Sequence, residues 1–161
     1  QTFNVTSVYP VCESAENMDY LIYVSFAAPI NPDDALKIVD EAIVKKYQVE
    51  TKDIDDNTYL YTLRSIPRSD SDYNIALSLN GKQIGSDSKA NLTLTIYAKD
   101  KFAAVDFDVE KASGEAALFF SQPLKQDQNL NGLVYFSQNK LAAKYDIQDN
   151  VIIVYFDKSN L

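Results

Sequence analysis

Apolar and polar residues alternate along most of the chain. The segments 73–79 (YNIALSL) and 91–98 (NLTLTIYA) carry an apolar residue at nearly every second position. The segments 20–26 (YLIYVSF) and 151–156 (VIIVYF) are rich in β-branched and aromatic residues. Successive side chains of a strand point to opposite faces, so this period of two predicts half-buried β-strands. The sequence therefore predicts an all-β fold.

Turn residues separate the predicted strands. Asn, Asp, Ser, Gly and Pro cluster in the stretches 31–34 (NPDD), 67–72 (PRSDSD), 85–91 (GSDSKAN) and 112–115 (ASGE). Short strands with regular turn signals between them are typical of an antiparallel β-sandwich.

Two motifs each occur twice. FAAPINPDDAL at 26–36 returns as FSQPLKQDQNL at 120–130, and DIDDN at 53–57 returns as DIQDN at 146–150. The first pair is offset by 94 residues and the second by 93. Two matches in register to within one residue indicate a duplicated domain with a one-residue deletion in a loop. We therefore predict two tandem Ig-like or macroglobulin-like β-sandwich domains, residues 1–99 and 100–161.

The second predicted domain is short. Two strand-like segments follow DIDDN in the first copy, whereas 11 residues follow Asn150 in the second. A sandwich of this size buries little core and leaves an open sheet edge. We expect this domain to lack its last strands or to borrow them, and the chain to be an N-terminal piece of a longer protein.

The segment 33–47 (DDALKIVDEAIVKKY) fits two structures. A helix would use Asp33 or Asp34 as its N-cap and would place four apolar residues near one face: Leu36, Val39, Ile43 and Tyr47. The alternative is a strand over 36–40 and a second strand over 43–50. By analogy with the second copy, we predict the two strands.

Composition and charge exclude several classes of function. The chain is 46% apolar and 24% charged, its net charge is −8, it has no histidine, and Cys12 is its one cysteine. The negative charge argues against binding to nucleic acid or to an anionic membrane surface. The residue types rule out a His-based triad, a His/Cys zinc site and an internal disulfide. No apolar run reaches the roughly 18–20 residues of a membrane span. Because Gln1 is not methionine, we expect an upstream segment to have been removed, as in a mature secreted or envelope protein.

The repeated Asp-Asn motif is a candidate calcium site. Asp53, Asp55 and Asn57 have the spacing of the first three ligands of an EF-hand loop, but Thr58 and Arg64 replace its glycine and its bidentate glutamate. The second copy keeps three oxygen ligands and has glutamine at the third position: Asp146, Gln148, Asp149 and Asn150. Since Asp and Asn side chains bond their own backbone in turns and tolerate positive φ, we predict hairpin turns in both copies.

The remaining acidic pairs and the cysteine have structural interpretations. Asp33 with Asp34, and Asp70 with Asp72, could serve acid–base chemistry, but they lie in predicted loops and are expected to be solvated turn residues. Cys12 follows a strand-like segment with no basic neighbour, and we expect it to be a small buried residue.

Four tyrosines are predicted to point outward from their strands, where they could stack on sugars: Tyr20, Tyr23, Tyr59 and Tyr61. Cross-strand packing explains them more simply. Pro29 and Pro123 are expected to end strand pairing at the same place in both copies, since proline cannot donate to a ladder.

The second copy resembles a macroglobulin-type domain near the N-terminus of bacterial α2-macroglobulins. The resemblance rests on FSQPL at 120–124, on QNLNGLV at 128–134 and on the Ile147 to Asn150 turn. It covers residues 102–161, and residues 1–100 are similar only in outline. Proteins of this family are envelope-associated protease traps, many with a thioester that needs Cys-x-Glu-Gln. The CESA at 12–15 departs from that motif, so no active residue of the family is transferred to this chain.

The resemblance implies a non-catalytic scaffold segment of an α2-macroglobulin-like protease inhibitor. It also implies a bacterial cell-envelope location, periplasmic or associated with the outer membrane, with any lipid anchor outside this chain. Its partners would be neighbouring domains of the parent protein and, through the full-length protein, target proteases. The alternative is an Ig-like spacer or glycan-binding module of a bacterial surface protein. We expect no catalytic, cofactor-binding or metal-binding residues and no cofactor.

Overall fold

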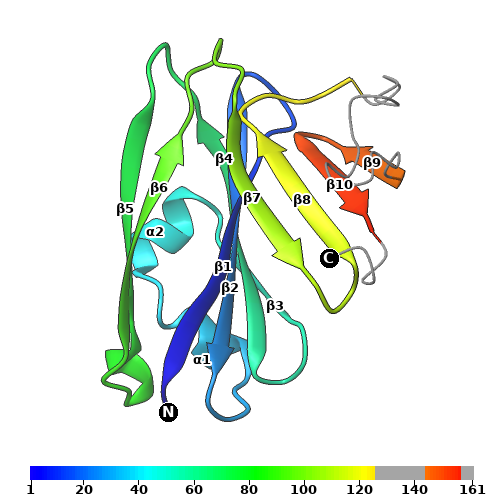
Figure 1. Cartoon of the computed structure of the whole chain (residues 1–161). Coiled ribbons are helices and arrows are strands. Elements are labelled where there is room, and N and C mark those ends of the chain that lie inside the picture. Colours follow the sequence, from blue (N-terminus) through cyan, green and yellow to red (C-terminus); the bar gives the residue numbers. More distant parts are fainter. Residues whose placement is uncertain (126–143, 157–161) are drawn as a thin grey trace. The chain divides into compact units, whose positions relative to one another are not determined.

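The computed structural model describes residues 1–125 and 144–156, which form mostly antiparallel β-structure (Figure 1). The predicted all-β class is confirmed at this level. By its contacts the chain divides into two compact units. Unit 1 comprises residues 1–10 and 16–99, and unit 2 comprises residues 11–15 together with the chain from residue 100 onward.

Unit 1 contains a four-stranded sheet in the order β1-β2-β4-β3 and a separate β5–β6 hairpin. Its strands are β1 (Phe3–Val11), β2 (Asn17–Phe26), β3 (Glu50–Asp53), β4 (Thr58–Pro67), β5 (Tyr73–Asn80) and β6 (Lys89–Ile96). The predicted alternation is present: along β2 every second residue from Met18 to Phe26 is buried, and in β5 and β6 the buried residues are also two apart. Period-two patterning therefore places one face of each strand in the core.

The predicted strands at 36–40 and 43–50 are wrong, because the region consists of two short helices and the turns that follow them. It forms α1 (Pro32–Leu36) and α2 (Glu41–Lys46), and β3 begins only at residue 50. Local capping explains the difference. The Asn31 side chain accepts a hydrogen bond from the Asp34 amide at 2.8 Å, with proline next in the chain, and the Asp40 side chain accepts from the Ala42 amide at 2.7 Å. These N-caps satisfy amides that the first helical turn leaves without partners.

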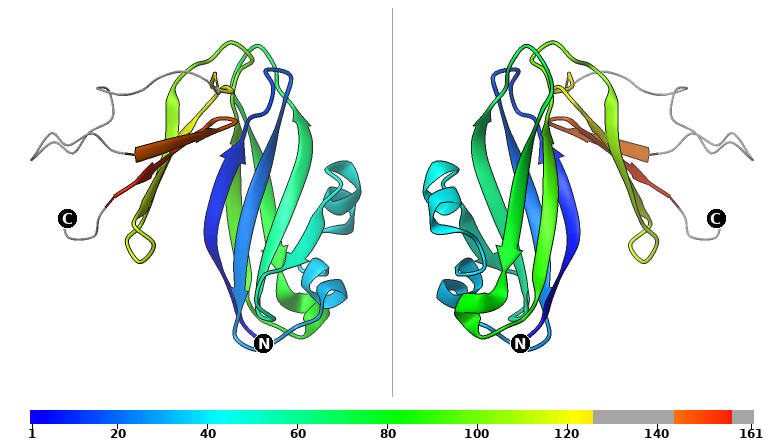
Figure 2. Two further views of the ribbon diagram at one scale, coloured as in Figure 1. Left: turned by 90° about the vertical axis from the view of Figure 1, so that its right-hand side faces the viewer. Right: turned by 90° about the vertical axis from the view of Figure 1, so that its left-hand side faces the viewer.

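The core of unit 1 lies between the sheet, the helices and the hairpin. Figure 2 shows α1 and α2 on one side of the four-stranded sheet. The fully buried residues there include Ile22, Val24 and Phe26 of β2, and Tyr59 and Tyr61 of β4. A short 3-10 helix, η1 (Gly81–Ile84), connects β5 to β6.

Unit 2 repeats the four-stranded sheet of unit 1. Its strands are β7 (Ala104–Glu110), β8 (Glu115–Phe120), β9 (Lys144–Gln148) and β10 (Val151–Tyr155). Their order, β7-β8-β10-β9, corresponds strand for strand to β1-β2-β4-β3. A left-handed glycine, Gly114, sits in the β7–β8 turn with φ of 69°.

The same hydrogen bonds close both sheets. The Phe26 amide donates to the Asn57 carbonyl at 2.7 Å, and Asn57 Nδ2 donates back to the Phe26 carbonyl at 3.1 Å. The Phe120 amide donates to the Asn150 carbonyl at 2.8 Å, and Asn150 Nδ2 donates back at 3.0 Å. We call each pair a Phe–Asn clasp. The repeated motifs of the sequence thus occupy equivalent places, although residues 126–130 of the second copy lie outside the described part of the chain.

The chain after each clasp is held in the same way. The Ile30 amide donates to the Asp56 carbonyl at 3.2 Å, and the Leu124 amide donates to the Asp149 carbonyl at 2.7 Å. Pro29 and Pro123 come immediately before these amides, three residues after β2 and β8 have ended. The prolines therefore follow the strand ends and do not themselves terminate the ladder.

Candidate functional site

The first Asp-Asn motif forms the turn of the β3–β4 hairpin, as predicted. Asp53 Oδ1 accepts from the Asp56 amide at 2.6 Å, and Asp55 Oδ1 accepts from the Thr58 amide at 3.0 Å. Asp56 has a φ of 66°, in the left-handed region that aspartate tolerates. The carboxylates that calcium would need are thus bonded to the backbone of their own turn, and the Asn57 amide side chain belongs to the first clasp.

The second motif forms the turn between β9 and β10, where Gln148 pairs with Val151. Asp149 has a φ of 51° and Asn150 is fully buried in the second clasp. Over residues 1–125 and 144–156, no group of three or more Asp, Glu, Cys or His side chains is arranged to hold a metal ion. Both copies therefore have the geometry of structural turns.

The two acidic pairs lie in different kinds of local structure. Asp34 Oδ2 accepts from Asn31 Nδ2 at 3.1 Å and Asp34 Oδ1 accepts from Lys37 Nζ at 2.8 Å, whereas Asp33 faces the cavity described below. Asp72 Oδ1 accepts from the Ala98 amide at 2.7 Å. The predicted loop position is wrong for Asp33 and Asp34, which lie within α1. Asp72 lies in the loop before β5, as predicted, and orders the backbone at the end of unit 1.

The predicted outward orientation of the tyrosines is wrong for three of the four. Tyr20, Tyr59 and Tyr61 are between 0% and 4% exposed. Their hydroxyls donate to backbone carbonyls in the interior, at 2.6 Å from Tyr20 to Thr95 and at 2.5 Å from Tyr61 to Ala35. A buried tyrosine normally finds such a partner for its hydroxyl. The tyrosine stripe that sugar stacking would require is therefore not on the surface.

Tyr23 is the half-buried member of the four, and it meets Tyr9 edge-on with ring centroids 6.0 Å apart. This is the cross-strand aromatic packing that the sequence favoured.

Cys12 is fully buried, which confirms its predicted position. Its backbone amide donates to Asn150 Oδ1 at 3.0 Å within unit 2. The Asn150 side chain thus donates to the end of β8 and accepts from Cys12. It connects the β9–β10 turn to a segment 138 residues earlier in the sequence.

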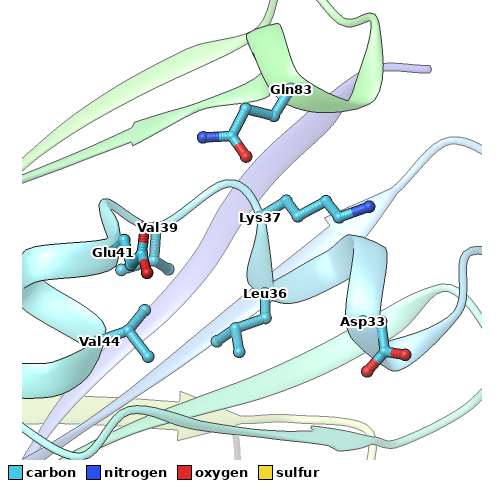
Figure 3. Close-up of a pocket in the computed structure, with 7 residues that line it drawn as sticks. All are labelled: Asp33, Leu36, Lys37, Val39, Glu41, Val44 and Gln83. Atoms are coloured by element: carbon cyan, nitrogen blue, oxygen red, sulfur yellow. The ribbon is translucent and has the colours of Figure 1, made fainter.

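A concave feature of unit 1 lies between α1, α2 and η1 (Figure 3). It has a volume of about 210 Å³ and is lined by Asp33, Leu36, Lys37, Val39, Glu41, Val44 and Gln83. Its apolar lining comes from the two helices and the turn between them, and its rim is charged. The cavity is smaller than the roughly 300–1,000 Å³ of sites that enclose drug-sized ligands.

Lys37 of the charged rim pairs with Asp34, the residue next to the lining residue Asp33. The hydrogen bond from Lys37 lowers the pKa of the Asp34 carboxyl, and the same contact raises the pKa of the Lys37 ammonium. A catalytic lysine needs the opposite shift, toward neutrality. Both side chains are solvent-exposed, so their ion pair contributes little to stability.

Sequence reasoning did not find this cavity. The helical alternative for residues 33–47 places Leu36 and Val39 near one face of the helix, and this alternative indicates an apolar face near residue 40. Gln83 could not have been found in this way, because tertiary structure alone brings η1 next to the helices.

Comparisons with protein-family models, with curated proteins and with solved structures find no match to this chain. Among the described residues, no helix is long and apolar enough to cross a membrane.

Proposed function

We propose that this chain is a non-catalytic scaffold segment of a bacterial α2-macroglobulin-like protease inhibitor of the cell envelope. The observation that carries the proposal is that one structural feature, a four-stranded sheet closed by a Phe–Asn clasp, occurs in both units. Both units have the same strand order and the same Phe–Asn clasp. Two of the stretches behind the family resemblance, FSQPL at 120–124 and the Ile147 to Asn150 turn, lie at the second clasp, and the third, at 128–134, is outside the described residues.

The repeated residues are engaged in shaping the backbone. In each copy the asparagine closes a strand end, and the aspartate before it supplies a left-handed turn. A binding or catalytic site depends on side chains that point at a ligand, whereas the Asn57 and Asn150 side chains bond the main chain. Repetition of such contacts is what a string of similar scaffold domains requires.

The finer architecture belongs to the same proposal. In unit 1 the four-stranded sheet and the β5–β6 hairpin are joined by the Tyr20 hydroxyl, which donates to the Thr95 carbonyl. This contact between two sheets supports a sandwich for unit 1, and the shared strand order supports a related domain in unit 2. Neighbouring domains of the parent protein, and proteases acting on that protein, are the proposed partners.

The proposal is tested on the natural full-length protein. It is incubated with a broad-specificity endopeptidase, and the mixture is separated by size-exclusion chromatography. A trap retains the protease in the high-molecular-weight fraction, where hydrolysis of a small peptide substrate persists and hydrolysis of a large protein substrate falls. The protease inactivated beforehand at its active site is the control, because a trap closes only after cleavage.

Two results would contradict the proposal. One is a full-length protein that is neither cleaved nor found with the protease. The other is co-elution that is equal for active and inactivated protease, which would indicate simple binding.

A further inference from the structure

Unit 2 has an apolar sheet face that is partly open to solvent. Phe107 is 63% exposed and Val109 is 40% exposed, both on β7. Strand register places Phe107 opposite Leu118 and Val109 opposite Ala116. On the other side of β8, Leu118 is opposite Ile152 and Ala116 is opposite Val154. Residues directly opposite on neighbouring strands share a face. We call these six residues the unit 2 apolar face: Phe107, Val109, Ala116, Leu118, Ile152 and Val154.

The opposite face of β7 is acidic. Asp106, Asp108 and Glu110 alternate with the two apolar residues along the strand. Such alternation is the pattern of a strand with one face turned to a core and the other to water. The exposure of Phe107 therefore reflects a core-type face that the described residues leave incompletely covered.

The equivalent face in unit 1 is buried. By the sequence offset, Leu118 corresponds to Val24 and Ile152 corresponds to Tyr59, and both of these unit 1 residues are 0% exposed. On the β4 side, the helical region covers this face, since the Tyr61 hydroxyl donates to the Ala35 carbonyl.

On the β1–β2 side of unit 1, the β5–β6 hairpin provides the cover. The Phe3 amide of β1 donates to Ser88 Oγ, next to β6, at 3.2 Å, and the Tyr20 hydroxyl of β2 donates to the Thr95 carbonyl. The hairpin turns four aliphatic residues inward, each 2% exposed or less: Leu77, Leu79, Leu94 and Ile96.

The open part of unit 2 matches the area that this hairpin covers in unit 1. Strand order makes β7 the counterpart of β1, and β7 carries Phe107 and Val109. On β10, the counterpart of β4, Ile152 is only 8% exposed. Exposure is thus greatest where the β5–β6 counterpart would lie.

We propose that the β7–β8 side of the unit 2 apolar face is a docking site for an amphipathic β-hairpin supplied by polypeptide outside these 161 residues. The occupant has the chemistry of β5–β6: two antiparallel strands with aliphatic residues at alternate positions on the docking face and polar residues on the other. This inference does not depend on the protease-trap proposal, because it follows from the repeat and the exposed face.

The test extends the chain with its own hairpin. A copy of residues 69–98 is attached after Leu161, which continues the repeat in register because the second offset is 93. Tethering raises the effective concentration of the hairpin to about millimolar. The matched control extension has serine in place of the copies of Leu77, Leu79, Leu94 and Ile96.

Hydrogen exchange of residues 106–110 and binding of a hydrophobic dye are compared among the original chain, the extended chain and the control. We expect the apolar extension to slow exchange of these amides about tenfold or more and to reduce dye binding. The control extension should do neither. Phe107→Ser in the original chain should lower dye binding, whereas Ile54→Ser, which removes a 46% exposed side chain of unit 1, should leave it unchanged.

Three outcomes overturn the proposal. Absence of dye binding by the original chain would mean that its own residues cover the face. Self-association that is lost in Phe107→Ser would identify a second copy as the occupant. Equal exchange rates in the apolar and serine extensions would mean that the face does not select an amphipathic hairpin.

Discussion

Replacing Asn150 with alanine tests whether the second Phe–Asn clasp holds unit 2 together. The Asn150 side chain is fully buried, donates to the Phe120 carbonyl at 3.0 Å and accepts from the Cys12 amide at 3.0 Å. Alanine removes both bonds, and each buried group that loses a partner costs about 1–3 kcal/mol. Because the two bonds share one side chain and their losses are not additive, we expect a total loss of about 2–4 kcal/mol in the stability of unit 2.

Asn57→Ala is the matched control, since Asn57 occupies the same place in unit 1. Its side chain is only partly buried and donates to the Phe26 carbonyl at 3.1 Å, so its loss should cost about 1 kcal/mol. In both copies the positive φ belongs to the preceding aspartate, so neither substitution adds backbone strain.

The assay is hydrogen exchange resolved by peptide, because a chain of two units does not unfold as a single two-state system. Asn150→Ala should accelerate exchange in β8, β10 and residues 11–15, and leave β2 and β4 unchanged. The control should affect β2 and β4 instead. Equal losses in the two variants, or a loss below about 0.5 kcal/mol for Asn150→Ala, would refute the clasp as the source of unit 2 stability.

Three further predictions concern unit 1. Tyr61→Phe removes the hydrogen bond to the Ala35 carbonyl and should lower stability by about 1 kcal/mol, measured by urea unfolding monitored on unit 1. Burial raises the pKa of the Tyr61 hydroxyl, so the folded chain keeps this proton at a pH where the unfolded chain, with a pKa near 10, releases it. Stability should therefore be unaffected below about pH 10 and fall above it. The fall should be less steep in Tyr61→Phe, which has no hydroxyl to titrate. Gly81→Ala would bring a Cβ within 2.5 Å of the Ser86 Cβ and should cost about 1–3 kcal/mol. Gly85→Ala, with φ of 72° and open space around it, should cost about 1–2 kcal/mol from backbone strain alone. Unchanged stability in Gly81→Ala would contradict the steric argument, and unchanged stability in Gly85→Ala would contradict the strain argument.

The sequence predicted the features that depend on neighbouring residues. Period-two alternation located β5 and β6, the content of β-branched and aromatic residues located β2 and β10, and the Asp-Asn motifs predicted both hairpin turns. The pattern at 33–47 offered one helix with its N-cap at Asp33 or Asp34, whereas the chain forms two short helices capped at Asn31 and Asp40.

The inward face of β4 shows why the rest needed the tertiary structure. In TYLYTL at 58–63 both faces carry residues that could be buried, so periodicity cannot choose between the Tyr59–Tyr61 face and the Leu60–Thr62 face. Tyr59 and Tyr61 turn inward because the Ile30 and Ala35 carbonyls lie within reach of their hydroxyls, at 2.5 Å in each case. Those carbonyls come from a segment about 30 residues away in sequence.

By itself the sequence determined the all-β class, the alternating strands, the turn chemistry and the repeated motifs, because each depends on short-range periodicity or on comparing one stretch with another. The tertiary structure decided which face of each strand is covered, where the clasp asparagine finds its partners, and which apolar residues stay open on β7. Burial and hydrogen-bonding partners depend on contacts between residues that are far apart in the sequence, and the local pattern of residues does not specify those contacts.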